Sequence, residues 1–229
     1  MKLRKRWTKV VDAVAMHVLP MKYYNLLQCS KQGLWQNYFT DAEAEIKAQW
    51  DETIWPLIKD FDFNSVLELA PGAGRNTERL CEVSKKIYAI DFNAYAIEQT
   101  RERLGSSYRG CDIEYHVNNG SDISMIADGS ISAIYCWDAA VHFDKSILSS
   151  YIQEFARVLG AGGKGFVHHS NLGDKAHTNI KKNPGWRSNM SKESFAEMCE
   201  ANGLRVAAQV DIPWRNIKDC VTVFEKRMS

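Results

Sequence analysis

The sequence predicts an α/β fold built around a mostly parallel sheet. Short apolar runs of strand length alternate with helix-length segments from residue 66 to residue 167. The first run, 66–69, leads into a turn of small residues, and the second, 86–91, ends in a carboxylate. In an open parallel sheet the ligand lies beyond the carboxyl ends of the strands. These two strand ends are therefore where we expect the binding site.

The turn after the first strand predicts a nucleotide-type binding loop. Gly72 and Gly74 permit a positive φ and leave bare backbone for a ligand to approach. The next helix, expected to begin with Asn76 or Thr77 as its N-cap, would offer free N–H groups. Thr77 stands at the third glycine position of the dinucleotide fingerprint, and no Gly-Lys-Ser/Thr follows. Neither a pyrophosphate loop nor a Walker loop is therefore favoured.

Asp91 supports a nucleoside ligand. It ends the second strand, 17 residues after Gly74. A carboxylate at this place can accept two hydrogen bonds from ribose hydroxyls. Nicotinamide enzymes use the same device, so Asp91 indicates a nucleoside without identifying it.

Three motifs in order resemble those of the class I S-adenosylmethionine-dependent methyltransferases. Residues 68–74 resemble motif I, with Ala70 where that family often has a first glycine. Residues 136–138 resemble motif IV, and 159–164 resemble the family's turn into strand five. The resemblance implies a Rossmann-like sheet of seven mostly parallel strands, with helices on both faces and an antiparallel last strand.

The resemblance also implies S-adenosyl-L-methionine as the cofactor. Gly120 falls where many of these enzymes have an acid, so we expect Ser121 or Asp122 to meet the adenine edge. The expected cofactor-binding residues are Glu68, Ala70, Gly72, Gly74, Asp91, Phe92, Asn93, Gly120, Ser121, Asp122, Cys136, Trp137 and Asp138.

Three histidines are candidates for a general base. A hydroxyl acceptor needs a base, for which histidine is suited, whereas an amine acceptor mainly has to be held neutral. His142 follows the fourth strand, and His168 and His169, which rank ahead of it, end the fifth. A regular strand would present only one of the two neighbouring histidines to the pocket, because successive side chains alternate between faces, whereas both could reach it if the strand ends before them.

The acceptor is expected to be a small molecule, a hydroxyl of a sugar, glycan or natural product. Trp186, Arg187, Trp214 and Tyr38 are the candidate acceptor contacts. Three alternatives stay open: N-methylation of a small amine, a non-catalytic S-adenosylmethionine-binding protein, and a nicotinamide-dependent reductase. The chain lacks the Asn-Pro-Pro-Tyr motif typical of nucleic-acid methylation, and no clear acidic pair predicts a metal.

The amino-acid composition indicates which kinds of partner and which cellular location to expect. Lys and Arg total 29 against 28 for Asp and Glu, so the chain lacks the basic excess typical of nucleic-acid binding. Six cysteines without metal-ligand spacing indicate reduced thiols and a cytoplasmic protein. No apolar run reaches the roughly 18 residues of a membrane span, so no stable membrane insertion is expected. We expect a helical cap or lid over residues 1–60 and the methyltransferase domain over 61–229.

Overall fold

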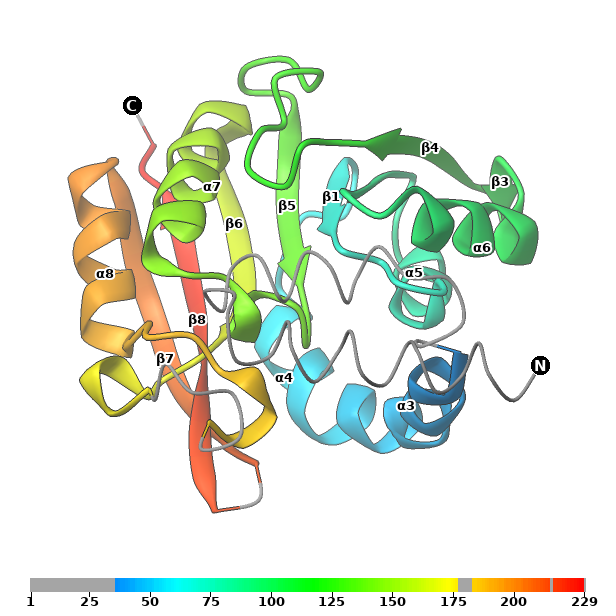
Figure 1. Cartoon of the computed structure of the whole chain (residues 1–229). Helices are drawn as coiled ribbons and strands as arrows, with labels where there is room; N and C mark the ends of the chain where they lie inside the picture. The colour runs from blue at the N-terminus through cyan, green and yellow to red at the C-terminus, as the bar shows by residue number, and fades with distance from the viewer. Residues whose placement is uncertain (1–35, 177–182, 215, 229) are drawn as a thin grey trace.

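The computed structural model describes residues 36–176, 183–214 and 216–228 (Figure 1). The part of the expected cap before residue 36 lies outside the described residues. The side chain of Tyr38, a candidate acceptor contact, lies outside them as well.

One sheet organises the described chain. Its strand order is β3-β4-β2-β1-β5-β6-β8-β7. The five central strands from β4 to β6 pair in parallel, and β8 pairs antiparallel with both β6 and β7. The strands are β1 (Val66–Leu69), β2 (Lys86–Asp91), β3 (Ser107–Tyr108), β4 (Cys111–Val117), β5 (Ile131–Cys136), β6 (Leu159–His169), β7 (Leu204–Trp214) and β8 (Ile217–Lys226).

The predicted fold class is confirmed, with one strand more than expected. The sheet has eight strands where seven were predicted, because the two-residue strand β3 turns back onto the edge strand β4. A two-residue strand carries no periodicity that a sequence pattern could reveal.

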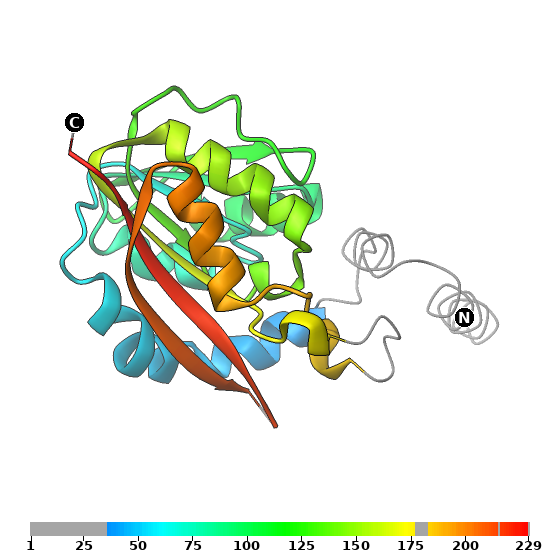
Figure 2. The same cartoon turned by 90° about the vertical axis from the view of Figure 1, so that its left-hand side faces the viewer.

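Helices cover both faces of the sheet. Figure 2 shows α7 and α8 on one side and α3 and α4 on the other. The core beneath α7 and α8 includes Tyr151 and Phe195, and the opposite core includes Trp50 and Leu80. The helical elements are α3 (Gln36–Gln49), the π-helical turn η1 (Trp50–Ile54), α4 (Trp55–Ile58), α5 (Arg75–Cys81), α6 (Ala94–Leu104), α7 (Lys145–Val158), α8 (Lys192–Ala201) and the short 3₁₀ turns η2 (Ala140–His142), η3 (Gly173–Lys175) and η5 (Pro184–Trp186).

Side-chain caps set where several helices begin. The Asn93 side chain accepts the Tyr95 N–H at the start of α6, and Ser191 caps α8 as predicted. The expectation for α5 was wrong: its N-cap is Gly74, not Asn76 or Thr77. Both of those side chains are buried within the first turn, so they pack inside the fold rather than cap it.

Strand β6 is longer than predicted. The glycine-rich run 159–164, expected to be a turn, lies within β6, and its pairing with β5 shifts register between Ile131 and Ala133. The strand continues through His169. A Cβ at Gly165 would stand 2.2 Å from the Phe224 ring, so glycine is needed for that ring to pack across the strand.

Candidate active site

The loop between β1 and α5 presents bare backbone at the carboxyl edge of the sheet. Ala70, Gly72 and Gly74 all have positive φ, of 62°, 62° and 82°. The Thr100 hydroxyl on α6 donates to the Gly72 carbonyl at 2.9 Å. A Cβ at Gly74 would lie 3.0 Å from the Thr100 methyl group. The loop therefore packs tightly on α6, and a larger residue at position 74 would push it away.

Glu68 lies buried beneath this loop. Burial raises the pKa of its carboxyl to about 8, while the neighbouring Thr77 hydroxyl lowers it. One carboxyl oxygen, Oε2, has no hydrogen-bond partner among the described residues. A buried unpaired oxygen at this place fits a ligand that brings a hydrogen-bond donor.

The Asp91 carboxyl connects the end of β2 to the glycine loop. The Asn93 N–H donates to its Oδ1 at 2.9 Å. Burial raises the pKa of Asp91 to about 7, and the backbone N–H groups of Asn93, Gly72 and Phe92 lower it. The carboxyl is thus positioned by both strand ends, as a ribose-binding acid requires.

Hydrogen bonds within the loop after β4 fix the positions of Ser121 and Asp122. Gly120 has a φ of 88°, and a Cβ there would lie 3.7 Å from the Phe92 Cβ. Asp122 Oδ1 accepts the Ser124 N–H at 2.6 Å, and the Ser121 N–H donates to the Asn119 side chain. Both expected adenine contacts therefore already hold their own turn together.

The end of β5 carries the predicted run Cys136, Trp137 and Asp138. Cys136 is fully buried, and the Trp137 indole N–H donates to the Gln49 side chain at 3.1 Å. Asp138 has a φ of 60°, and its carboxylate lies 3.3 Å from the Arg75 guanidinium. Asp138 therefore stands beside the residue that follows the glycine loop.

A cavity of about 720 Å³ adjoins Asp138 and Arg75. Its walls come from α3, η1 and α4 on one side and from the ends of β5, β6 and β7 on the other. It brings together four of the predicted residues, Trp137, Asp138, His168 and Trp214. Among the described residues, its ionisable lining consists of His168, the guanidinium of Arg75 and four carboxyl groups, those of Glu45, Glu52, Asp138 and Asp211.

The two adjacent histidines of β6 point to opposite faces of the sheet, as the strand alternation predicts. His168 lines the cavity, and its ring stacks on Trp137 with centroids 4.4 Å apart. His169 stacks on Phe195 of α8, and its two nitrogens contact Thr222 Oγ1 and the Ser170 carbonyl. Burial lowers the pKa to about 3 for His168 and to about 4 for His169. The structure thus brings only His168 to the cavity.

His142 has a defined tautomer. Its Nδ1 lies 3.1 Å from the Trp186 carbonyl, so Nδ1–H donates and Nε2 is the basic nitrogen. Burial lowers the pKa of His142, which keeps the ring neutral at pH 7. The residue lies in η2, directly after the end of β5.

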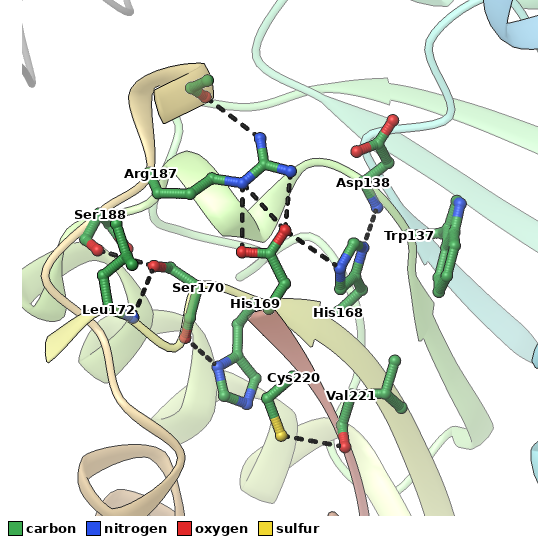
Figure 3. Close-up of polar contacts among 12 residues, drawn as sticks. Trp137, Asp138, His168, His169, Ser170, Leu172, Arg187, Ser188, Cys220 and Val221 are labelled. Carbon is green, nitrogen blue, oxygen red and sulfur yellow. Dashed lines mark hydrogen bonds and ion pairs between the residues drawn. The ribbon is translucent and has the colours of Figure 1, made fainter. Parts of the chain in front are cut away.

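Arg187 is buried in an ion pair that the sequence did not indicate. Its Nε and Nη2 both donate to Asp219 Oδ2, at 2.9 and 2.7 Å (Figure 3). Its guanidinium lies 4.1 Å from the centroid of the Trp214 ring. Neither Trp186 nor Arg187 lines the cavity, although both were predicted as acceptor contacts. Asp219 was missed. The only available signal was one carboxylate at the start of an apolar strand run.

The fold and this site define an α/β protein of the class I methyltransferase type. Residues 66–163 match the family model described as a methyltransferase domain. The match and the fold agree with the predicted class, an S-adenosylmethionine-dependent methyltransferase, and with the predicted cofactor. No curated protein matches the chain.

Solved structures share the fold at low identity. An S-adenosylmethionine-dependent methyltransferase from Clostridium acetobutylicum aligns with a TM-score of 0.64 and 15% identity, over 83% of this chain and 98% of that one. One from Methanosarcina mazei aligns with a TM-score of 0.62 and 17% identity, over 76% and 98%. A chain from the complex between the Haloferax volcanii Trm112 methyltransferase activator and a methyltransferase aligns with a TM-score of 0.60 and 17% identity, over 82% of this chain and 96% of that one. In the described part of this chain, no helix has the length and apolar character needed to traverse a bilayer.

Proposed function

We propose that this methyltransferase acts on a small molecule bound in the cavity beside Asp138. The observation that carries the proposal is the position of that cavity, which meets Arg75 after the glycine loop and Asp138 at the end of β5. A cavity of this size suits a small molecule. The adjoining loop supplies the place for the cofactor.

Two kinds of group would hold the cofactor: buried carboxyl oxygens that can form hydrogen bonds to it, and loop backbone that it can approach closely. Asp91 would accept the ribose hydroxyls, and the loop from Ala70 to Gly74 would receive the methionine part. Glu68 Oε2 is a buried oxygen with no hydrogen-bond partner among the described residues, so it is free to bond to the cofactor. When bound, S-adenosylmethionine supplies an activated methyl group for in-line transfer. The protein then has to align the acceptor atom with the methyl group and to accept the proton that the acceptor loses.

We propose that the acceptor atom is a hydroxyl of a sugar, glycan or natural product, with His142 as the general base. His142 lies in η2, four residues after the cavity residue Asp138, and is not part of the described cavity lining, so the acceptor hydroxyl would have to extend from the cavity toward η2. His168 was ranked ahead of His142 from sequence, but its Nδ1 accepts the Asp138 N–H, which leaves the proton on Nε2. His169 is enclosed on the other face of the sheet. His142 keeps a neutral ring and a basic Nε2, which is the state a base needs.

The test uses S-adenosylmethionine with a deuterated methyl group and a panel of small hydroxyl and amine acceptors, with products detected by mass. His142→Asn keeps an N–H donor for the Trp186 carbonyl and removes the basic nitrogen. We expect it to lower kcat for a hydroxyl acceptor by about 100-fold or more. An unchanged kcat would show that His142 is not the base.

N-methylation of a small amine is the second candidate function. It is favoured by the described part of the cavity lining, in which four carboxyl groups stand against one guanidinium. Carboxylates attract an ammonium group and can take up its proton before transfer. For an amine acceptor, His142→Asn should leave kcat within about twofold of the wild type, because no histidine is then required.

Three further expectations belong to this proposal. We propose that α3, η1 and α4 form the lid part of the predicted cap, since they supply one wall of the cavity. A near-neutral charge supports a partner other than nucleic acid. The five described cysteines, which are free thiols, support a cytoplasmic location.

A further inference from the structure

Asp138 adopts a backbone conformation that needs support. Its φ is 60°, which residues other than glycine seldom adopt, although aspartate tolerates it better than most. The conformation turns its carboxylate toward Arg75, at 3.3 Å, on the wall of the cavity. Anything that fixes this peptide also fixes the carboxylate.

His168 supplies a direct contact to that peptide. The Asp138 N–H donates to His168 Nδ1 at 3.3 Å, and the imidazole stacks on Trp137 (Figure 3). Since Nδ1 accepts, Nε2 carries the proton, and it lies 3.7 Å from Asp219 Oδ2. The ring is 3% exposed, so it has little freedom to turn away.

A buried ion pair lies behind His168, with Asp219 Oδ2 3.7 Å from Nε2, which has no hydrogen-bond partner among the described residues. Asp219 is fully buried and receives two nitrogens of Arg187, whose third, Nη1, donates to the Gly185 carbonyl at 3.1 Å. The guanidinium also stacks on Trp214. Strands β5, β6 and β8 and the loop at residues 185–187 thus meet in one chain of contacts that ends at the Asp138 N–H.

We propose that His168 is a positioning residue: with Asp219 and Arg187 behind it, it holds the Asp138 peptide so that the carboxylate faces the cofactor and acceptor. The inference rests on the proposed function of Asp138 at the cavity. It assigns to His168 a role other than proton transfer, and to the Arg187–Asp219 pair a role other than acceptor contact.

Two substitutions of His168 test the contacts of its two imidazole nitrogens separately. His168→Asn can place a carbonyl oxygen where Nδ1 stands and so keeps the acceptor for the Asp138 N–H. His168→Gln reaches toward Asp219 with its terminal amide but leaves that N–H without an acceptor. His116→Gln on β4, whose imidazole contacts Glu114, is the matched histidine control.

The first readout is the amide resonance of Asp138 in nitrogen-15 spectra. We expect it to keep its position in His168→Asn and in the control, and to move upfield in His168→Gln. The second is the dissociation constant for S-adenosylhomocysteine, measured by calorimetry. We expect about fivefold to tenfold weaker binding in His168→Gln and less than about twofold in His168→Asn.

A double variant provides the third readout. With Asp138→Ala in place, His168→Gln should weaken binding no further, because no carboxylate remains to be positioned. Equal weakening in the Asn and Gln variants, or additive effects in the double variant, would overturn the proposal and leave His168 as a packing residue. If the wild type does not bind S-adenosylhomocysteine, the proposed function fails, while the amide resonance still tests the contact between His168 and Asp138.

Discussion

Ala70 shows at the scale of one residue how the motif I loop departs from its usual form. The loop needs a left-handed residue there, with a φ of 62°, and alanine adopts it at a cost of roughly 1–2 kcal/mol. Glycine would remove that cost while adding about 0.4–1 kcal/mol of unfolded-chain entropy.

We therefore predict that Ala70→Gly raises the free energy of unfolding by about 0.5–1 kcal/mol. Urea denaturation measures it. Ala73→Gly, in the same loop but without a positive φ, should lower stability instead. If both variants lose stability equally, the strain assigned to Ala70 is absent.

Buried ionisable groups give the free protein a defined pH dependence. Burial raises the pKa of Glu68 from 4.5 to about 8 and that of Asp91 from 3.8 to about 7. The folded state then holds protons that the unfolded state has released, so these two groups lower stability as pH rises. His168 and His169, whose folded pKa values are lowered to about 3 and 4, act in the opposite sense up to pH 6.5.

Above pH 6.5 the carboxyl effect outweighs the histidine effect, because the unfolded histidines have by then released at least half of their protons. We predict that the free energy of unfolding falls by about 1–2 kcal/mol between pH 6.5 and 8, since one proton contributes about 1.4 kcal/mol per pH unit. Urea denaturation at the two pH values checks this. Glu68→Gln should remove most of the fall, whereas the exposed Glu98→Gln should keep it. A wild type equally stable at both values would contradict the raised pKa of Glu68.

Residues at the ends of predicted strands could be located from the sequence. Contacts between residues far apart in the chain could not. The glycine loop and Asp91 follow directly from their strands, so the sequence identifies them. Arg187 was predicted to contact the acceptor, yet its partner Asp219 stands 32 residues further along, on β8. Only the folded sheet brings that carboxylate beneath the guanidinium.

At the scale of elements, Arg103 of α6 connects α3 to α5, the helix that follows the glycine loop. Two guanidinium nitrogens of this α6 residue donate to the Glu43 carboxylate on α3, each at 2.8 Å, and it also binds Glu78 on α5. The side chains of Arg103, Glu43 and Glu78 are 30–43% exposed, so each pair alone contributes little and the network provides the strength.

We predict that Arg103→Ala lowers the local opening free energy of α3 by about 1 kcal/mol, which makes its amides exchange about fivefold faster. Hydrogen exchange read by mass spectrometry measures this. Arg101→Ala on the same helix, where the arginine pairs with Glu98, is the control and should leave α3 unchanged. Equal exchange in the two variants would show that Arg103 does not hold α3.

Element boundaries were predictable where side chains set them. Ser191 and the end of β2 behave as expected, because a cap and a buried apolar run are local signals. The extension of β6 through 159–164 was not predictable, since it depends on a register shift against β5 and on the Phe224 ring. Glycines that look like a turn can serve close packing within a strand.

At the scale of the whole molecule, the sheet order places the glycine loop, Asp91 and Asp138 on neighbouring strands β1, β2 and β5. Their carboxyl ends therefore share one edge, with the cavity next to β5. We propose that this edge binds the cofactor through Asp91 and that the cavity beside it holds the acceptor.

Isothermal titration with S-adenosylhomocysteine, NADH and NADPH tests this claim most directly. We predict that only S-adenosylhomocysteine binds, and that Asp91→Ala weakens its binding by at least about tenfold, because the carboxyl group that would bond the ribose hydroxyls is lost. The exposed Asp128→Ala, which removes a carboxylate paired with Arg157, should bind as the wild type does. Binding of a nicotinamide nucleotide instead, or unchanged binding in Asp91→Ala, would contradict the account.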